Sequence, residues 1–500
     1  MRIHFIAIAV LIVLFLPITA SAHVNSPDVY YDGNAGPYHL LVTVRPPAVV
    51  PGVAEIDIRS AGDVDQIEIL PMKMVGAPAN LAPTPDVAER SAADPHLFHG
   101  KLWIMARGSW KVQVRVTGKQ GAAEMAVPLP AVSSHSATMQ TGLGALLSIL
   151  GIVLLAGMVG IIGAANRDAS LEAGQEPTPS QTKRAYRRMA VAAAVLIAAV
   201  VGGGYWWSVD AADNARLNYR VPQAQASLQA GNVLRLQLDN PNKLENMFPS
   251  DMVERIKRMG IKIPDVFRLD DLIPDHGHLL HLFLVQTPDM KSFWHLHPEQ
   301  SGTGEFTAQL PSLPAGRYQI YADIVHNTGF PETQVAVIDL PAIAGEPLRG
   351  DDSGAGDFST SNNVAQLPDG SRMVWERGSQ PLHAEDAFWF RFRVEDKDGK
   401  PVSDLEPYMG MAGHAVFISN DGKIFAHVHP AGSVAMAAVD LAGDQGQPQK
   451  QEMAGMNSAP IGAEVAFPYG FPQNGDYRIF VQIKRGGHVD TGEFSAHVGQ

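Results

Sequence analysis

Short runs of alternating hydrophobic and polar residues fill the region 23–132, and Pro and Gly separate one run from the next. The segment 110–116 (WKVQVRV) is an example, with an apolar residue at every second position. Alternation of this kind places every second side chain on one face of a strand, as in half-buried antiparallel sheets. Helical spacing is absent here, so the even distribution of runs predicts a β-sandwich domain at 23–140.

Two segments without alternation, 141–165 and 189–207, carry no charge. Each is long enough to cross a hydrocarbon layer of about 30 Å as a helix, and Tyr205-Trp206-Trp207 fits an interfacial aromatic anchor. The alternative, buried core helices of a soluble protein, fits neither their length nor their flanks. Basic residues gather in the loop 166–188, which the positive-inside rule places in the cytoplasm. The regions 23–140 and 208–500 then face the opposite, periplasmic or extracellular, side of the plasma (inner) membrane.

The first 22 residues have the pattern of a secretory signal peptide. Arg2 precedes an apolar run, and Thr19-Ala20-Ser21-Ala22 provides an A-x-A cleavage site. Cleavage after Ala22 would leave His23 as the mature N-terminus. The 500 residues include no cysteine, so disulfides and thiolate metal sites are excluded. The net charge of −13 argues against nucleic acid as a partner.

The region 208–500 contains an internal repeat. HLFLVQTPDMKSFWHLHPE (281–299) matches HAVFISNDGKIFAHVHPAG (414–432) with one gap, and LPAGRYQIYADIV (313–325) matches FPQNGDYRIFVQIK (471–484). Duplication over this length predicts two similar β-sandwich domains, 208–348 and 364–500, joined by a linker at 349–363. One helix is expected at Asp251–Met259. The predicted fold class is mainly β: three Ig-like or cupredoxin-like β-sandwich domains, two transmembrane helices and a cleaved signal peptide.

Histidines are concentrated in this repeat. In the second copy, His414 precedes the turn Asn420-Asp421-Gly422, and His427 and His429 follow it. The centre of the turn decides whether His414 lies opposite His427 or opposite His429. In either register the three imidazoles share one face, with opposed Cβ atoms about 5 Å apart, which is close enough to share a metal ion.

The first copy offers His281, His295 and His297, with three more histidines nearby in the sequence, His276, His278 and His326. The competing interpretation is that the HxHP motif serves packing and its imidazoles bond to neighbouring loops.

Met409 and Met411 lie just before His414. Thioether and imidazole ligands together suit copper, whereas methionines also serve as core filler. Met453 and Met456, in a low-complexity loop at about 433–462, could join the same site. The first copy lacks such methionines and has a longer turn, Thr287–Met290, so zinc is the alternative metal there.

His23 is a separate candidate ligand. A mature N-terminal His can chelate copper through its amino group and Nδ1, and His39, His96 or His99 could complete a site suited to Cu(II). The alternative is that cleavage before a His is a coincidence.

These motifs carry a family resemblance. An exported β-sandwich that begins with His after A-x-A resembles the CopC-type periplasmic copper-binding family. The repeats, with YMGMAGH and FAHVHP, are similar to the YtkA-like and FixH-like domains of membrane-anchored bacterial proteins. The resemblance implies a membrane-anchored protein of metal handling.

The expected function is copper binding for delivery, storage or resistance, with another periplasmic or membrane metal-handling protein as partner. One alternative is an assembly protein on a two-helix anchor, with structural or pH-sensing histidines. Another is a copper oxidoreductase, although a blue-copper thiolate and the motifs G-x-S-x-G and HExxH are absent. An enzyme is therefore not favoured. Neither apolar segment contains an ionisable residue, so a transport path through this chain alone is not expected.

Overall fold

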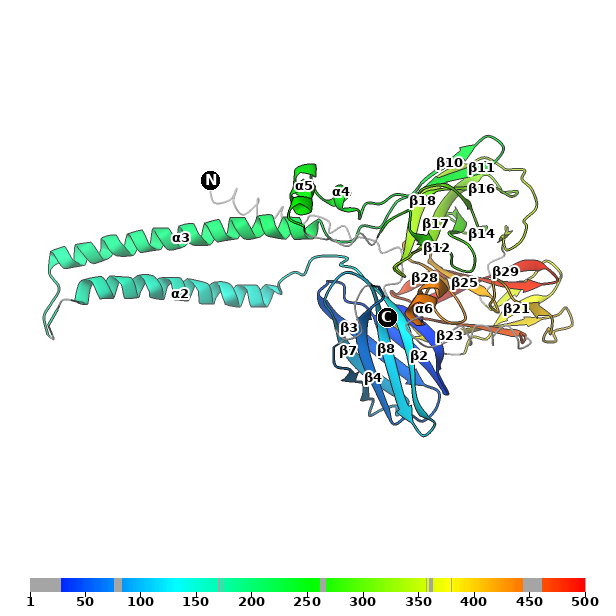
Figure 1. Ribbon diagram of the computed structural model, residues 1–500, viewed down its shortest axis with the longest axis horizontal. Coiled ribbons are helices and arrows are strands. Elements are labelled where there is room, and N and C mark those ends of the chain that lie inside the picture. The colour runs from blue at the N-terminus through cyan, green and yellow to red at the C-terminus, as the bar shows by residue number, and fades with distance from the viewer. Residues whose placement is uncertain are drawn as a thin grey trace. The chain divides into compact units, whose positions relative to one another are not determined.

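The computed structural model describes residues 28–75, 83–169, 171–172, 174–260, 267–356, 358, 363–378, 380–443 and 461–499. The chain divides into two compact units, one comprising Met1–Val132, Arg220–Asn246 and Ser250–Gln500, the other Ser133–Tyr219 with Met247–Pro249. The strands belong to the first unit and the two long helices to the second (Figure 1). As the hydrophobic pattern predicts, the described chain is mainly β and carries two long apolar helices.

Two sheets before residue 132 enclose one hydrophobic core. The first sheet has the order β1 (Val29–Ala35), β2 (Tyr38–Arg45), β3 (Gly52–Ser60), β7 (Leu97–Ile104), β6 (Glu89–Arg90). The second has the order β5 (Asp86–Val87), β4 (Gln66–Lys73), β8 (Gly108–Gly118), β9 (Gly121–Ala131). Val112, Val114 and Val116 are fully buried between them, at the alternate positions that the sequence indicates. We call these two sheets the N-terminal sheet pair.

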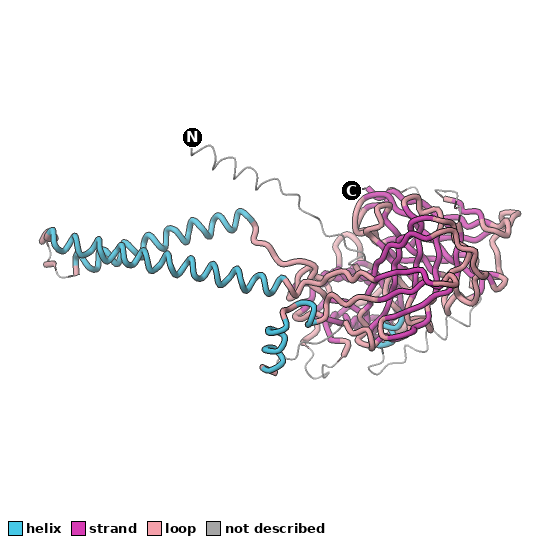
Figure 2. Tube along the Cα trace, turned by 90° about the horizontal axis from the view of Figure 1, so that it is seen from above, coloured by secondary structure: helices cyan, strands magenta, loops and turns pink. Residues whose placement is uncertain are grey.

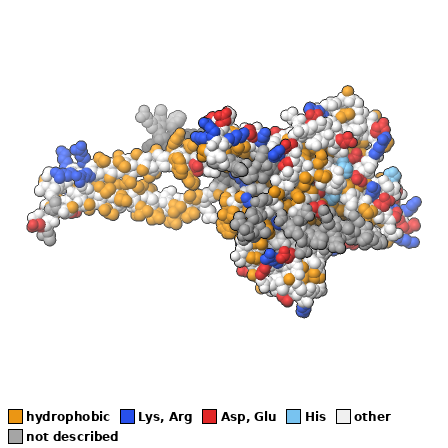
Figure 3. Space-filling model, viewed as in Figure 1, with side chains coloured by type: hydrophobic (Ala, Val, Ile, Leu, Met, Phe, Trp, Pro, Cys, Tyr) orange, Lys and Arg blue, Asp and Glu red, His pale blue; other side chains and the backbone are white. Residues whose placement is uncertain are grey.

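The second unit holds the helices α2 (Thr141–Asp168) and α3 (Pro179–Ala215), which run side by side (Figure 2). Both extend beyond the apolar segments 141–165 and 189–207. Thr178 and Gln181 form a capping box at the start of α3, with Pro179 in its first turn. Apolar side chains cover the helices, and Lys and Arg gather near the end where they are joined (Figure 3). Each helix is long and apolar enough to cross a membrane.

The first repeat also consists of two sheets. One has the order β10 (Gln225–Gln229), β11 (Val233–Gln237), β16 (Glu305–Gln309), β15 (Glu299–Gly302). The other has the order β12 (Leu272–Ile273), β17 (Gly316–His326), β13 (His281–Thr287), β14 (Phe293–Leu296), β19 (Ser353–Ala355), with β18 (Pro331–Leu340) paired to β17. The helices α4 (Leu244–Met247) and α5 (Ser250–Arg258) lie between β11 and β12 in the chain. The predicted linker 349–363 therefore includes a strand, because β19 pairs with β14.

The second repeat has the same plan. One sheet has the order β20 (Val364–Gln366), β21 (Arg372–Trp375), β23 (Phe388–Glu395), β27 (Glu464–Tyr469). The other has the order β22 (Leu382–His383), β29 (His488–Gly499), β28 (Gly475–Arg485), β25 (His414–Ser419), β26 (Phe425–Val428), with β24 (Leu405–Glu406) paired to β28. The helix α6 (Met436–Gly443) follows β26. The order β14-β13-β17 of the first repeat matches β26-β25-β28 of the second.

The two repeats pack through these matching strands. Phe293 stacks on Phe480 at 4.4 Å between ring centroids, and Tyr321 stacks on Phe425 at 4.2 Å. In the repeat alignment Phe293 corresponds to Phe425, and Tyr321 corresponds to Phe480. Each stack is therefore the counterpart of the other, which is the pattern that a two-fold relation between the repeats produces. We call this relation the pseudo-two-fold.

Candidate metal centre

Eight histidines gather where the two repeats meet, and centroids of neighbouring rings lie 3.9–6.2 Å apart. They come from β13, β14, β25, β26 and the chain just beside these strands. The set, here called the histidine cluster, consists of His276, His278, His281, His295, His297, His414, His427 and His429.

Strand register explains why these rings meet. In the first repeat Leu282 pairs with Leu296, so His281 lies opposite His297. In the second repeat Ala415 pairs with Val428, so His414 lies opposite His429. Of the two registers that the hairpin sequence allows, the structure has the one centred on Asp421 and Gly422. The rings of His427 and His429 share a face because the residues are two apart.

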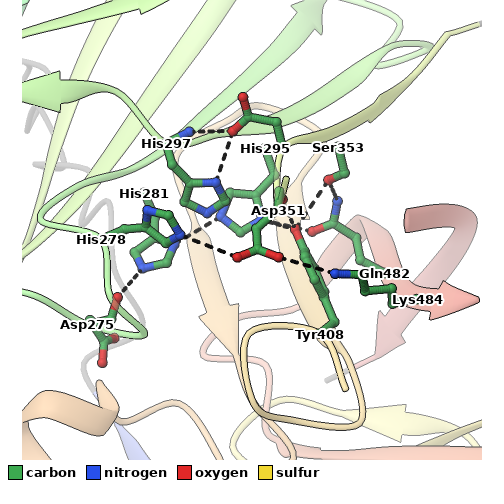
Figure 4. A network of polar contacts seen from close by, with 11 residues as sticks. Asp275, His278, His281, His295, His297, Asp351, Ser353, Tyr408, Gln482 and Lys484 are labelled. Carbon is green, nitrogen blue, oxygen red and sulfur yellow. Dashed lines mark hydrogen bonds and ion pairs between the residues drawn. The ribbon is translucent and has the colours of Figure 1, made fainter. Parts of the chain in front are cut away.

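His281, His295 and His297 form the first triad, in which one nitrogen of each ring lies within 4.8 Å of the others. His281 Nδ1 and His295 Nε2 face each other at 3.0 Å (Figure 4). All three residues come from the first repeat, as the sequence predicts for this copy. A separation of this size is compatible with two imidazoles that share one cation.

The outer nitrogens of the first triad bond to protein acceptors (Figure 4). His281 Nε2 lies 3.1 Å from the carbonyl oxygen of Asp275, and His295 Nδ1 lies 3.0 Å from Gln482 Oε1. His297 Nδ1 lies 3.0 Å from a carboxylate oxygen of Asp352. Each of these nitrogens must therefore carry a proton and donate it, which leaves a lone pair on the inner nitrogen. Histidines that bind metal are held in this way.

His276, His414 and His429 form the second triad, again with nitrogens within 4.8 Å of one another. His276 Nε2 and His429 Nε2 are 3.3 Å apart, and His429 Nδ1 lies 3.1 Å from the carbonyl oxygen of Val434. His414 is fully buried, and neither of its nitrogens has a hydrogen-bond partner among the described residues. This triad differs from the expected set in the second copy, because it takes His276 from the first repeat in place of His427.

The sequence predicts His276 only as a histidine near the first copy's candidate site, with no role in the second copy's site. A signal for its role was present, because Asp275-His276-Gly277-His278 aligns with Tyr408-Met409-Gly410-Met411. Both segments form tight turns, in which His276 has φ +52° and Met409 has φ +50°. The turn places the His276 ring 5.4 Å from that of His414, between centroids.

His427 and His278 belong to neither triad, and the His427 ring lies 4.5–5.6 Å from rings of both triads. The His427 ring is 5.4 Å from that of His414, and its Nδ1 lies 3.4 Å from the Asp323 carboxylate. His278 stacks on His297 at 3.9 Å and lies 3.6 Å from the Asp351 carboxylate. Asp323 of the first repeat thus holds His427 of the second, as Gln482 of the second holds His295 of the first.

Burial keeps four imidazoles of the cluster neutral. It is the main cause that lowers the pKa of His281, His295, His414 and His429 well below the usual value, and neighbouring imidazoles add to the effect. Neutral imidazoles present lone pairs at neutral pH, which is the state that binds a metal ion.

The described residues leave several buried cluster nitrogens without a partner: both of His414, and Nε2 of His297 and of His427. Leaving a buried polar group unpaired costs about 1–3 kcal/mol. Four such atoms in one cluster are a large cost for packing alone, whereas a bound cation would give the lone pairs a partner. The donor set therefore fits a metal that prefers imidazole.

The other candidate ligands either belong to neither triad or lie outside the described residues. Met411 is buried in a hydrophobic cluster that it shares with the N-terminal sheet pair, and Met409 is partly buried in its turn. Their role as ligands stays a prediction. His326 bonds to the Arg268 carbonyl and to Asp271, apart from the cluster. His39 and His99 pair with aspartates of the N-terminal sheet pair. The residues 1–22, His23, Met453 and Met456 lie outside the described residues.

Comparisons with known proteins give one family match and several distant structural matches. Residues 365–500 match a family model described as "Domain of unknown function (DUF8832)". No curated protein matches the chain. Among solved structures, a tetra-tandem repeat from the extending region of a large adhesion protein is 7% identical at TM-score 0.16, with 92% of this chain and 74% of that chain covered.

Two other matches are similarly distant. A bacterial ice-binding adhesin is 4% identical at TM-score 0.14, with 90% of both chains covered. Salmonella α2-macroglobulin is 9% identical at TM-score 0.18, with 97% of this chain but only 24% of that chain covered. Scores of this size carry no argument about the fold or the function of this chain.

Proposed function

We propose that this protein is a membrane-tethered metal-binding protein whose histidine cluster holds copper for delivery, storage or resistance. The observation that carries the proposal is the orientation of the first triad. Asp275, Gln482 and Asp352 accept hydrogen bonds from the outer nitrogens, and the inner nitrogens of His281 and His295 face each other at 3.0 Å. Two lone pairs repel at this distance, and a cation between them turns the repulsion into two bonds.

Copper fits the donor set because imidazole suits copper and zinc, and Cu(II) stands above Zn(II) in the order of divalent affinities. Zinc is the competing metal in both triads, because each contains imidazoles only. Met409 supports copper if its thioether reaches the cluster, since thioethers select Cu(I). A partner that receives or supplies the ion, in the periplasm or the membrane, belongs to the proposal.

The proposed location is the plasma membrane, with the sheets on the periplasmic or extracellular side. Two helices long enough to span, and basic residues between them, support this arrangement. The signal peptide 1–22, three β-sandwich domains and the likeness to CopC-type, YtkA-like and FixH-like domains complete the proposal. Reporter fusions at residues 140, 175 and 500 should read outside, inside and outside, and a cytoplasmic signal at 500 would contradict the location.

The test of function is metal content of the full-length protein in detergent. After incubation with Cu(I), Cu(II) or Zn(II) and desalting, we expect copper to be retained most strongly. The double variant H281A/H414A should lose most of this copper, because it removes a ligand from each triad. His326→Ala is a matched control, since His326 is also fully buried but bonds elsewhere. Wild-type protein without bound copper or zinc would overturn the proposal.

An assembly role is the second candidate, and the position of the cluster at the contact between the repeats favours it. In that case the imidazoles serve packing, and H281A/H414A would change stability without any metal dependence. Thermal unfolding with and without EDTA separates the two candidates, because only a metal-binding cluster makes the unfolding temperature depend on the chelator.

A further inference from the structure

We infer that the histidine cluster holds two metal ions at separate positions, and that the second ion binds across the two repeats at His276, His414 and His429. The inference deepens the proposed function and depends on it. It assigns a site to a turn residue, His276, and it makes the metal a cross-link between the repeats.

The ligand atoms separate into two sets. The nitrogens within each triad lie within 4.8 Å of one another, and no histidine belongs to both triads. Within the second triad, His276 Nε2 and His429 Nε2 approach to 3.3 Å. One ion cannot take six imidazoles in these positions at bond lengths of about 2.0–2.1 Å, so each triad needs its own ion.

His414 provides the independent evidence for an ion in the second triad. Its side chain is fully buried, and among the described residues no group bonds to either ring nitrogen. The rings of His276 and His429 surround it at 5.4 Å and 5.1 Å between centroids. Because His429 Nε2 also offers a lone pair and lies 3.3 Å from His276 Nε2, a cation is a partner to which one nitrogen of each ring can bond, while the other nitrogen of the neutral His414 carries the proton.

Hydrogen bonds to surrounding groups fix the positions of the other two residues of this triad, His429 and His276. His429 Nδ1 bonds to the Val434 carbonyl, which directs Nε2 inwards. His276 is held by its turn, in which the backbones of Asp275 and His278 exchange two hydrogen bonds of 2.9 and 3.0 Å. The Asp275 carboxylate also accepts the N–H of Ala437, at the start of α6. The turn of the first repeat is thus fixed to the second repeat before a metal binds.

The pseudo-two-fold explains why only one such bridge consists of histidines alone. Met409 occupies the turn position in the second repeat that His276 occupies in the first, and each is followed by a glycine with positive φ. The counterpart of His276 with His414 and His429 would therefore be Met409 with His281 and His297. Duplication followed by this difference gives one bridge with three imidazoles, suited to Cu(I) or Zn(II) with an open fourth position.

The experiment is a metal titration of the full-length protein with Cu(I), and separately with Zn(II), followed by metal analysis. We expect two ions per wild-type chain, one in H276A, one in H297A and none in H276A/H297A. His326→Ala is the matched control, because His326 is also a fully buried histidine of the first repeat but bonds to the Arg268 carbonyl and to Asp271, outside the cluster; it should keep two ions. Thermal unfolding of each variant checks that it folds.

The outcomes distinguish this inference from the proposed function. Wild-type protein with a single ion, or H276A with two, would overturn the second site while metal binding itself stands. Wild-type protein with no ion would overturn both. A structural role for His276 alone would lower the unfolding temperature of H276A equally with and without EDTA. A metal cross-link predicts that the wild type loses more stability than H276A when EDTA is added.

Discussion

At the scale of single residues, the metal proposal depends on which nitrogen of each imidazole carries the proton. Asp275, Asp352, Gln482 and Val434 supply oxygen acceptors to the outer nitrogens, so the tautomers follow from the surroundings. These acceptors bind no metal themselves, but they orient the ligands and raise their basicity.

Gln482→Leu should weaken metal binding by the first triad about 10- to 100-fold, because His295 loses the acceptor that fixes its ring. The measurement is a competition titration against a chromophoric chelator. Gln482→Glu is the control, since it keeps an oxygen acceptor for His295. A carboxylate already occupies the corresponding position in the first repeat, where Asp323 lies beside His427. Equal affinities for the Leu and Glu variants would show that the hydrogen bond does not orient a ligand.

His414→Leu should stabilise the metal-free protein by about 1–3 kcal/mol, because it replaces a buried imidazole without partners by an apolar side chain. Urea unfolding in EDTA measures this effect. His326→Leu is the comparison and should be destabilising, since His326 Nδ1 has acceptors. If His414→Leu destabilises the protein as much as His326→Leu does, then His414 is a packing residue.

At the scale of elements, two hairpins and one tight turn bring the histidines of the two triads together. Register places His281 opposite His297 and His414 opposite His429. The turn at 275–278 adds His276, and Gly277 makes this turn with φ +88°. In the second triad the hairpin supplies two histidines and the turn supplies the third, whereas in the first triad all three come from the hairpin of β13 and β14.

Gly277→Ala should cost about 1–2 kcal/mol, since an L side chain at this φ is strained even though a Cβ there meets nothing within 4 Å. Displacement of His276 should also weaken the inter-repeat site. Gly62→Ala is the control, because Gly62 also has open space but no positive φ. Unfolding temperature and metal stoichiometry are the measurements, and equal behaviour of the two variants would contradict the role of the turn.

At the scale of the whole strand-bearing unit, the N-terminal sheet pair and the second repeat share side chains. Tyr30 lies in the core of the second repeat, where its ring is 5.7 Å from that of Tyr469. Trp389 Nε1 donates to Asp32 at 3.0 Å, and Lys111 Nζ donates to the Ala442 carbonyl at 2.6 Å. The segment 431–443, which follows the histidines, thus packs on the N-terminal sheet pair.

The ionisation of Asp28 should make the stability of the strand-bearing unit depend on pH. Burial raises the pKa of Asp28 to about 6, opposed by Arg45 and supported by Glu385 and Asp57. The folded protein holds this proton more tightly than the unfolded chain does. The contribution of Asp28 to the free energy of unfolding is therefore highest below pH 4, and it falls by up to about 3 kcal/mol as the pH rises to about 6.

Asp28→Asn removes this dependence. Between pH 4 and 6 the unfolding temperature of the wild type should fall relative to that of the variant, and above about pH 6 the difference should stay constant. Calorimetry across this range checks the prediction. A rise of the wild-type unfolding temperature relative to that of the variant over this range would mean that the carboxylate, and not the carboxyl, is stabilised in the fold.

The sequence by itself determined everything that follows from local period and spacing. Alternation in 110–116 predicted a buried valine face, uncharged segments predicted two long helices, and the hairpin with His414, His427 and His429 predicted three rings on one face. These properties depend on residues close in the chain, since strand parity and helix length need no knowledge of distant contacts.

Only the tertiary structure decided which histidines form a set. His276 joins His414 and His429 because the pseudo-two-fold brings the turn of one repeat against the strands of the other. The acceptor Asp352 lies in the segment that the composition marks as a linker, and Gln482 lies on a strand of the other repeat. Such contacts join residues from 55 to 187 positions apart, and they depend on how the sheets pack, which no local pattern encodes.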